Sequence, residues 1–505
     1  MTALSTPNTG ARSAGILLHV SSLPGPHGIG DLGPAAHDWI DRLAAAKLGW
    51  WQILPLGPPA AGNCPYQCYS AFAGNPQLIS PASLVEDGLL DESDIEGPQF
   101  PQQRVDFSRV TAFKSKLLDR AWARFANRAT KLQSSFEQFC TDESSWLDDY
   151  ALFMAIKERN GSSNWTTWHK PIARRHPSAI ASARRELADA IRRQQFIQFL
   201  FFRQLDVLRR YAHLRNVKLI GDLPIFISAD SSDVWANPHV FLLDRDRRPK
   251  AVAGVPPDAF SSTGQRWGNP LYRWSAMKKD GFAWWIARVR AALKQADLIR
   301  LDHFRGFIAC WQIPADHPTA EHGRWVRAPG RELFAALQRA LGSLPFIAED
   351  LGMITPDVEA LRDEMGLPGM RVLQFGFGGG WDNPHLPHQF VRNCVAYTGT
   401  HDNDTTIGWH ASLHPRDRKS VERYLGSADR DIAGQFIRLA WSSIADLAIA
   451  PMQDVLRLGP KARMNVPGKA NGNWAWRMTD NAAAGARMEQ LAEWTETYNR
   501  QTRGS

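Results

Sequence analysis

The sequence has no long hydrophobic run and nothing that resembles a secretory leader. No segment of its 505 residues approaches the roughly 18 consecutive apolar residues that a membrane-spanning helix needs. The first residues, Met1 to Ser13, are polar and lack the apolar stretch of a signal peptide. We therefore predict a cytoplasmic protein without a membrane partner.

Cysteine is scarce, with five residues scattered along the chain. An odd number without paired spacing argues against a disulfide framework. Cys64 and Cys68 could form half of a metal site, but no second pair of Cys or His stands at ligand spacing. We expect reduced thiols, and neither a bound metal nor a cofactor.

Basic residues are in excess, yet no nucleic-acid motif accompanies them. The formal net charge is +8 and the pI is near 9.3. Most basic residues are mixed with acids in helix-like stretches such as Arg174 to Arg193, which indicates solvated helical faces. Nucleic acid is therefore not an expected partner. The 20 tryptophans offer flat rings on which sugars can stack, but many of them will belong to the core.

Several segments repeat one pattern: an amphipathic helix, a glycine and a short apolar strand. Arg331 to Leu341 is such a helix, and Gly342 and an apolar strand follow it. Helices that end at glycine and lead into buried strands are typical of α/β proteins. Eight strands are predicted: Gly15–Val20, Trp50–Leu54, Lys218–Asp222, Leu298–Asp302, Phe346–Glu349, Arg371–Phe375, Cys394–Thr398 and Asp446–Ala450.

This number of strands predicts the α/β fold known as the (β/α)8 TIM barrel. The alternative is a doubly wound open sheet, which would carry a glycine-rich phosphate turn after its first strand. Val20 to Pro24 is not such a turn. We predict one catalytic barrel domain over residues 1–505. Mainly helical subdomains are inserted at about residues 57–216, and a loop insertion near the active site occupies about 223–277.

Acidic residues stand at or just after the ends of several predicted strands. In a barrel of this kind the active site lies at the carboxyl ends of the strands. Acids brought together there raise one another's pKa, which is costly unless they are used. Each of them could alone be a helix cap, but together they predict a site. The residues are Asp222, Asp302, Glu349, Asp350 and Asp402.

Cleavage of a glycosidic bond with retention needs one ionised and one protonated carboxyl group. Arg300 lies two residues before Asp302 and hence on the same face of the strand, where its charge would keep Asp302 ionised. An enclosed, aromatic-lined site would push the pKa of Glu349 upward. These residues predict Asp302 as the nucleophile and Glu349 as the general acid/base.

Three blocks around these acids resemble the catalytic blocks of the amylomaltases, also called 4-α-glucanotransferases or disproportionating enzymes. They form glycoside hydrolase family 77 in the α-amylase clan. Further blocks of the chain are similar to this family from about Gly15 to Arg477. The catalytic blocks are Arg300–Gly306, Ala348–Gly352 and Thr398–Asn403. The other blocks are Pro65–Gln67 with Ser70–Pro76, Gly221–Phe226, Gly254–Asp258 with Gln265–Pro270, Arg463–Gly468 and Gly472–Arg477.

The resemblance implies transfer of α-1,4-glucan segments between maltodextrins or to glucose, through a covalent glucosyl-enzyme intermediate. Asp402 would be the third carboxylate, which grips the hydroxyls of the distorted sugar and stabilises the transition state. Arg300 and His401 would support the site, and Asp350 would be structural. The implied substrate-binding residues are Tyr66, Asp222, Trp267, Asn269 and Asn465.

Three other functions compete with glucan transfer. Hydrolysis would use the same carboxylates with water as the acceptor, and the loop Gly254–Pro270 is the candidate segment for excluding water. A non-catalytic glucan-binding protein would tolerate loss of Asp302 or Glu349, yet both are present. A metal-dependent hydrolase could use His303 and His401 beside the acids, but paired-His spacing is absent and Arg300 would repel a cation.

Overall fold

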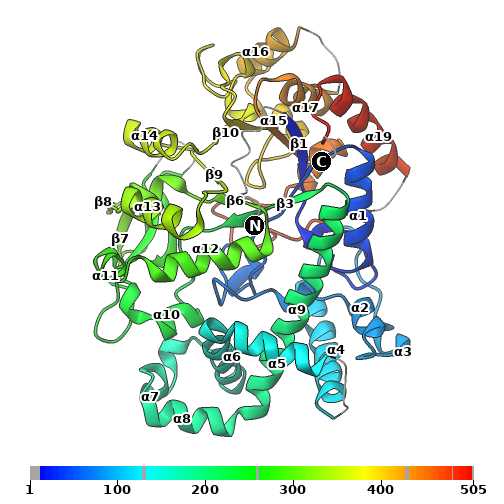
Figure 1. The fold of residues 1–505 in the computed structure, drawn as a ribbon. Helices are drawn as coiled ribbons and strands as arrows, with labels where there is room; N and C mark the ends of the chain where they lie inside the picture. The colour runs from blue at the N-terminus through cyan, green and yellow to red at the C-terminus, as the bar shows by residue number, and fades with distance from the viewer. Residues whose placement is uncertain (1–11, 128–131, 258–260, 427–430, 480–481, 503–505) are drawn as a thin grey trace.

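The computed structural model describes residues 12–127, 132–257, 261–426, 431–479 and 482–502. Asp258, at the end of one of the blocks with family resemblance, lies outside the described residues, as do residues 1–11 at the start of the polar N-terminal segment. Figure 1 shows a barrel at the centre, with helices above it and a large group of helices below it.

Eight parallel strands close into a barrel in the spatial order β1-β12-β11-β10-β9-β6-β3-β2. Every neighbouring pair is parallel, so all carboxyl ends meet at one rim. The predicted (β/α)8 barrel is therefore confirmed. The strands are β1 (Ser13–Leu17), β2 (Trp50–Gln52), β3 (Lys218–Leu223), β6 (Leu298–Leu301), β9 (Phe346–Ala348), β10 (Gly369–Val372), β11 (Cys394–Tyr397) and β12 (Leu447–Pro451).

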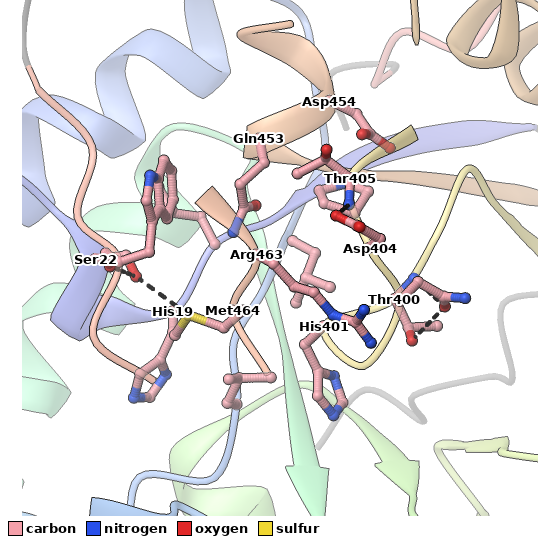
Figure 2. A pocket seen from close by; sticks show the side chains of 16 residues that line it. His19, Ser22, Thr400, His401, Asp404, Thr405, Gln453, Asp454, Arg463 and Met464 are labelled. Carbon is pink, nitrogen blue, oxygen red and sulfur yellow. Dashed lines mark hydrogen bonds between the residues drawn. The ribbon is translucent and has the colours of Figure 1, made fainter. Parts of the chain in front are cut away.

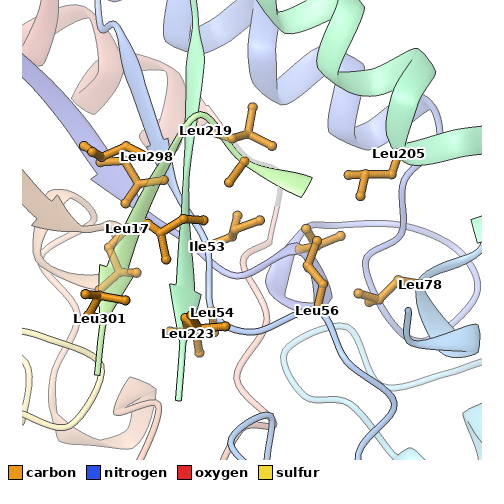
Figure 3. Packing of buried hydrophobic residues seen from close by; sticks show 14 of the residues in the cluster. Leu17, Ile53, Leu54, Leu56, Leu78, Leu205, Leu219, Leu223, Leu298 and Leu301 are labelled. Atoms are coloured by element: carbon orange, nitrogen blue, oxygen red, sulfur yellow. The ribbon is translucent and has the colours of Figure 1, made fainter. Parts of the chain in front are cut away.

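The strands are almost wholly buried, as expected for a parallel sheet covered on its faces. Leu17, Leu219, Leu298 and Leu301 belong to one buried apolar cluster that runs through β1, β3 and β6 (Figure 3). Gly15 allows the close approach of β1 and β2, because a Cβ atom there would lie 2.4 Å from the carbonyl oxygen of Trp50.

Helices cover the barrel, and the predicted helix Arg331–Leu341 is present as α13. The C-cap of α13 is Gly342 in the left-handed conformation, with φ of 79°. The covering helices are α1 (Pro34–Ala45), α11 (Trp274–Lys279), α12 (Ala283–Gln295), α13 (Gly330–Leu341), α14 (Pro356–Glu364), α15 (Thr406–Ser412), α16 (Pro415–Leu425), α17 (Ile432–Ser442), α18 (Met452–Val455) and α19 (Ala482–Thr497). None of the described helices is long and apolar enough to cross a membrane.

The connection between β2 and β3 is mainly helical. Its last two helices, α8 and α9, are separated by a break at Leu187. The helices are α2 (Pro81–Glu86), α3 (Glu92–Ile95), α4 (Phe107–Asn127), α5 (Gln133–Asp142), α6 (Ser144–Arg159), α7 (Lys170–Ala173), α8 (Pro177–Glu186) and α9 (Ala188–Leu214).

Two buried glutamines of α9 hold the segment that precedes α2. Gln198 accepts from the amide of Gly74 at 2.7 Å and donates to its carbonyl at 3.0 Å. Gln204 makes the same pair of bonds to Ser80, at 2.7 and 3.2 Å. The insertion thus anchors the chain just after the block that carries Tyr66.

The described part of residues 223–277 contains more regular structure than the expected loop. They contain the helix α10 (Ser232–Ala236) and the strands β4 (Ala251–Val255) and β5 (Gln265–Pro270). These strands join β7 (Ala309–Pro314) and β8 (Arg324–Arg327) in an antiparallel sheet of order β5-β4-β7-β8. The pairing partner of β4 is about 60 residues away in sequence, so local composition rich in Pro and Gly could not reveal it.

Candidate active site

Asp302 and Glu349 follow directly on two adjacent barrel strands. Leu301 at the end of β6 pairs with Ala348 at the end of β9. The amide of Glu349 donates to the carbonyl of Leu301 at 3.1 Å, which continues the ladder to the rim. The two acids therefore lie side by side at the carboxyl ends of the strands, and the charge of Asp302 acts on Glu349.

Arg300 joins two of the acids from inside the barrel. Its Nη1 donates to Asp302 Oδ1 at 2.9 Å and to the two carboxylate oxygens of Asp222 at 3.0 and 2.8 Å. The Arg300 and Asp222 side chains are almost fully buried, whereas that of Asp302 is 29% exposed. Arg300 thus faces two acids at once. Burial raises the pKa of Asp222 to about 7, an effect that Arg300 opposes, and Asp302 is the more exposed of the two acids.

A chain of hydrogen bonds continues from Asp222 to the other side of the site. Tyr66 Oη lies 3.0 Å from Asp222 Oδ2 and 2.9 Å from His401 Nε2. Burial and the neighbouring charge of Asp222 raise the pKa of Tyr66 well above its usual value, so the phenol keeps its proton. Burial lowers the pKa of His401, which favours the neutral imidazole.

Asp402 is held at the exposed side of this chain. Asn465 Nδ2 donates to Asp402 Oδ1 at 2.6 Å, and Arg463 donates to the Asp402 carbonyl at 2.7 Å. His401 Nε2 lies 3.5 Å from the second carboxylate oxygen of Asp402. The side chain is 47% exposed, so its oxygens face outward from a fixed position.

Glu349 accepts two backbone hydrogen bonds. The amide of His303 donates to Oε2 at 2.7 Å and the amide of Leu351 donates to Oε1 at 3.2 Å. His303 has a positive φ of 50°, a sparsely populated conformation that aims its amide at the carboxyl group. Burial raises the pKa of Glu349 well above its usual value; Arg300 opposes this effect and the charge of Asp302 adds to it.

Trp267 and Asn269 lie on β5, which contacts the Tyr66 segment through Gln67. Gln67 and Asn269 exchange two amide hydrogen bonds of 2.9 and 3.3 Å. The Trp267 ring meets the His303 ring edge-on, with centroids 4.9 Å apart. The second sheet therefore places Trp267 against His303, the residue that follows Asp302, and Asn269 against the segment that carries Tyr66.

Asp350 points away from this group, as strand alternation predicted. Its buried carboxylate accepts from Arg362 at 2.5 Å and from the amide of Met370 at 2.6 Å, with Arg371 at 3.4 Å. It joins β9 to β10 and α14. Among the residues that the structure describes, no group of three or more His, Cys, Asp or Glu is arranged to hold a metal ion.

Sequence reasoning missed Asp454, which lies in α18 after the last barrel strand. Its buried carboxylate accepts from Thr398 Oγ1 at 2.6 Å, from the amide of Thr406 at 2.7 Å and from Thr406 Oγ1 at 2.7 Å. It therefore ties together both ends of the segment that carries His401 and Asp402. Only its position after a barrel strand could have singled it out.

A pocket lies behind this segment (Figure 2). His401, Asp454 and Arg463 line it, and His19 faces it from the end of β1. Burial and, to a lesser extent, the neighbouring His401 lower the pKa of His19 to about 3. The imidazole of His19 is therefore neutral and adds no positive charge behind His401.

Comparison with known proteins fits this arrangement of acids on a barrel. A family model described as 4-alpha-glucanotransferase matches residues 18–482. The chain belongs to this family. As a member of the 4-alpha-glucanotransferases it is a glycosyl-transferring enzyme, as the sequence predicted.

Relatives match nearly the whole chain. A 4-alpha-glucanotransferase of Thermus thermophilus is 48% identical over 96% of this chain and 99% of its own length. One of Synechocystis sp. is 50% identical over 97% of this chain and 98% of its own. The solved structure of an amylomaltase from Streptococcus agalactiae in complex with acarbose has a TM-score of 0.95 and 38% identity, and the match covers 97% of this chain and 100% of that one.

Proposed function

We propose that this glucanotransferase moves α-1,4-glucan segments between maltodextrins, or to glucose, by a retaining double displacement. The observation that supports this proposal best is the pairing of Asp302 and Glu349 at one rim, with opposite environments. Asp302 is half-open and paired with Arg300, whereas Glu349 is a carboxyl group whose pKa burial raises. One group is suited to attack and the other to donate a proton.

In the first step, an Asp302 oxygen attacks C1 of the donor glucosyl unit. The bond from C1 to the leaving O4 breaks, and Glu349 gives its proton to that oxygen. A glucosyl ester on Asp302 and a free 4-hydroxyl are the products. Asp402 would hold sugar hydroxyls while the ring distorts, because Asn465 fixes one of its oxygens and leaves the other free to accept.

In the second step, the 4-hydroxyl of an acceptor glucan attacks C1 from the side that the leaving group vacated. Glu349, now ionised, takes the hydroxyl proton, and the ester bond to Asp302 breaks. Tyr66, Asp222, Trp267, Asn269 and Asn465 would line the glucose and glucan sites, and His401 would support them. Arg300 stays charged throughout, because its neighbours Asp222 and Asp302 raise its pKa against the effect of burial.

Transfer rather than hydrolysis requires that an acceptor glucan, not water, reaches the ester. The strand β5 brings Trp267 against His303, next to both catalytic acids. An apolar ring at this place would displace water from the region beside the ester and offer a stacking surface for an acceptor sugar. This contact supports transfer, and the family membership favours it as well.

Incubation of the purified enzyme with maltotriose tests the proposal. Transfer should yield free glucose together with a ladder of longer maltodextrins. Glucose and maltose without longer products would replace the proposal with hydrolysis. No turnover, with retained maltodextrin binding, would favour a non-catalytic glucan-binding protein.

We place the enzyme in the cytoplasm. Its five cysteines are all free thiols, which suits a reducing compartment. Fractionation of cells that produce the protein, followed by immunoblotting, tests this location. Recovery in the membrane or external fraction would contradict it.

A further inference from the structure

Trp381 is the exception among the tryptophans of the chain. All 20 lie within the described residues, and only Trp381 has an exposed side chain, with 45% of the residue accessible. A ligand that covered this large apolar ring would gain the free energy of removing it from water. The other 19 are accounted for by packing or by partial burial.

The Trp381 ring is held in place rather than hanging free. It stacks on Tyr424 of α16, with centroids 6.0 Å apart and planes inclined by 14°. His388 joins the two residues, because one ring nitrogen lies 2.7 Å from the Trp381 carbonyl and the other lies 2.9 Å from Tyr424 Oη. Phe377 packs edge-on beneath Tyr424 at 5.5 Å. The two rings thus form a preorganised aromatic platform.

Trp381 lies in the connection between β10 and β11, whereas Tyr424 belongs to α16. Residues 373–393, all of them described, contain only two short 3-10 turns and no α-helix. In the barrel, β10 lies between β9, which leads to Glu349, and β11, which leads to His401 and Asp402. The connection therefore leaves the barrel at the rim that carries the acids, between two catalytic segments.

Hydrogen bonds tie this connection to the active-site side. Gln374 at its base donates to the Asp404 carbonyl at 3.0 Å, close after Asp402. Asn383, two residues after Trp381, donates to the Phe375 carbonyl at 2.9 Å. The platform is thus on the catalytic side of the protein, while none of its hydrogen bonds reaches a catalytic acid.

We propose that Trp381 and Tyr424 form a second glucan-binding site, outside the catalytic cleft, that holds a distant part of a long α-1,4-glucan. The proposal rests on the proposed function for the choice of ligand. The exposed Trp381 ring offers a flat apolar surface to the C–H face of a sugar unit, and Tyr424, stacked against it, keeps the ring in place. The Arg423 guanidinium, 5.9 Å from the centre of the Trp381 ring, can donate to sugar hydroxyls. A short maltodextrin that fills the cleft would not reach this site.

Native electrophoresis in gels with and without amylose tests the proposal. The background is Asp302→Asn, so that amylose is not consumed. We compare it with the double variants that add Trp381→Ala, Trp381→Phe or, as a matched control, Leu214→Ala, an exposed apolar residue at the end of α9. Trp381→Ala should weaken retardation by amylose by about three- to tenfold. Trp381→Phe should keep most of it, and Leu214→Ala should change nothing.

The same single substitutions in the active enzyme separate this site from the catalytic cleft. Trp381→Ala should leave kcat and KM for maltotriose unchanged and raise KM for amylose. Unchanged retardation of the Trp381→Ala protein would overturn the proposal, and so would an equal loss with maltotriose, which would place Trp381 in the cleft. A change in oligomeric state of Trp381→Ala, measured by light scattering with unaltered amylose binding, would instead assign the surface to a second copy. If the wild-type enzyme failed to disproportionate maltotriose, the proposed function would fail, whereas the amylose gels would still report on the platform.

Discussion

Arg300 and Asp302, two residues apart at the end of β6, are joined by a hydrogen bond of 2.9 Å. The same nitrogen of Arg300 also reaches Asp222 on the neighbouring strand. Because side chains alternate along a strand, Arg300 and Asp302 both lie on the inner face of the barrel. The parallel pairing of β3 with β6 places Asp222 beside Arg300. The proposed nucleophile is therefore held by a buried cation that belongs to the barrel itself.

Removal of that cation should impair catalysis more than ligand binding. Arg300→Ala would leave Asp222 and Asp302 without their shared partner in a partly dry site. Loss of one partner of a buried charged pair costs about 2–5 kcal/mol, so kcat should fall by about 30- to several thousand-fold. Steady-state kinetics with maltotriose measure the effect. Arg300→Lys keeps the charge but replaces the planar guanidinium, whose Nη1 reaches both acids, with an ammonium group on a different stem, and an intermediate rate is expected. Wild-type activity in Arg300→Ala would exclude the proposed role.

Asp302→Asn should abolish turnover and spare binding. The amide cannot form the glucosyl ester, so activity should drop by about 10⁴-fold or more. Arg300 and Asn have compatible hydrogen-bonding groups, and the shape of the site should persist. Isothermal titration with a maltodextrin measures affinity, and quenched-flow or end-point assays measure turnover. Substantial activity of this variant would remove Asp302 as the nucleophile.

The rate should decline on the alkaline side as Glu349 loses its proton. Burial raises the pKa of Glu349, so the group stays protonated at pH values where a free glutamate, with a pKa of about 4.3, is ionised. The alkaline limb of kcat/KM should therefore have an apparent pKa well above 4.3, shared with the nearby carboxylates. In Glu349→Gln this limb should disappear for maltosyl fluoride, a donor whose leaving group needs no proton. A limb at the ordinary glutamate value would contradict the assignment.

Removal of divalent metals should not change the rate. The acids of the site are satisfied by Arg300, Asn465 and backbone amides, and none of the described groups of side chains has the composition of a metal site. Activity with maltotriose before and after treatment with EDTA measures the effect. Loss on chelation with recovery on adding a metal would favour the metal-dependent alternative.

The barrel and the position of the acids could be predicted because both follow from local patterns. Buried parallel strands are continuous apolar runs, and an acid at a strand end lies at the rim wherever the barrel closes. The exact ends of the strands could not be predicted from the apolar runs. The predicted strand Arg371–Phe375 is displaced to Gly369–Val372, because apolar residues continue into a 3-10 turn after the strand.

Features that depend on pairing across long distances stayed hidden. The strands β4 and β5 form because β7, some 60 residues farther on, offers an edge to β4. The hydrogen bond from the His303 amide to Glu349 depends on a left-handed backbone conformation at His303, which a histidine in the sequence does not predict. The roles of the ten site residues follow from the family resemblance, and the mutations proposed above test the central ones.

Asp454 provides the last prediction, because it acts on the site only through other residues. Its carboxylate binds Thr398 and Thr406, which flank His401 and Asp402. Asp454→Ala would leave two hydroxyls and one amide without a partner, at a cost of about 1–3 kcal/mol for a buried group. A displacement of Asp402 by about 1 Å could lower kcat about 100-fold. Asp454→Asn keeps one carbonyl oxygen for the Thr406 amide, while both hydroxyls can turn to meet its amide group, so most of the activity should return. Thermal melting and kcat for maltotriose would be measured on both variants. If Asp454→Ala lost stability but kept the wild-type kcat at a temperature where it is folded, Asp454 would be structural only and would not position Asp402.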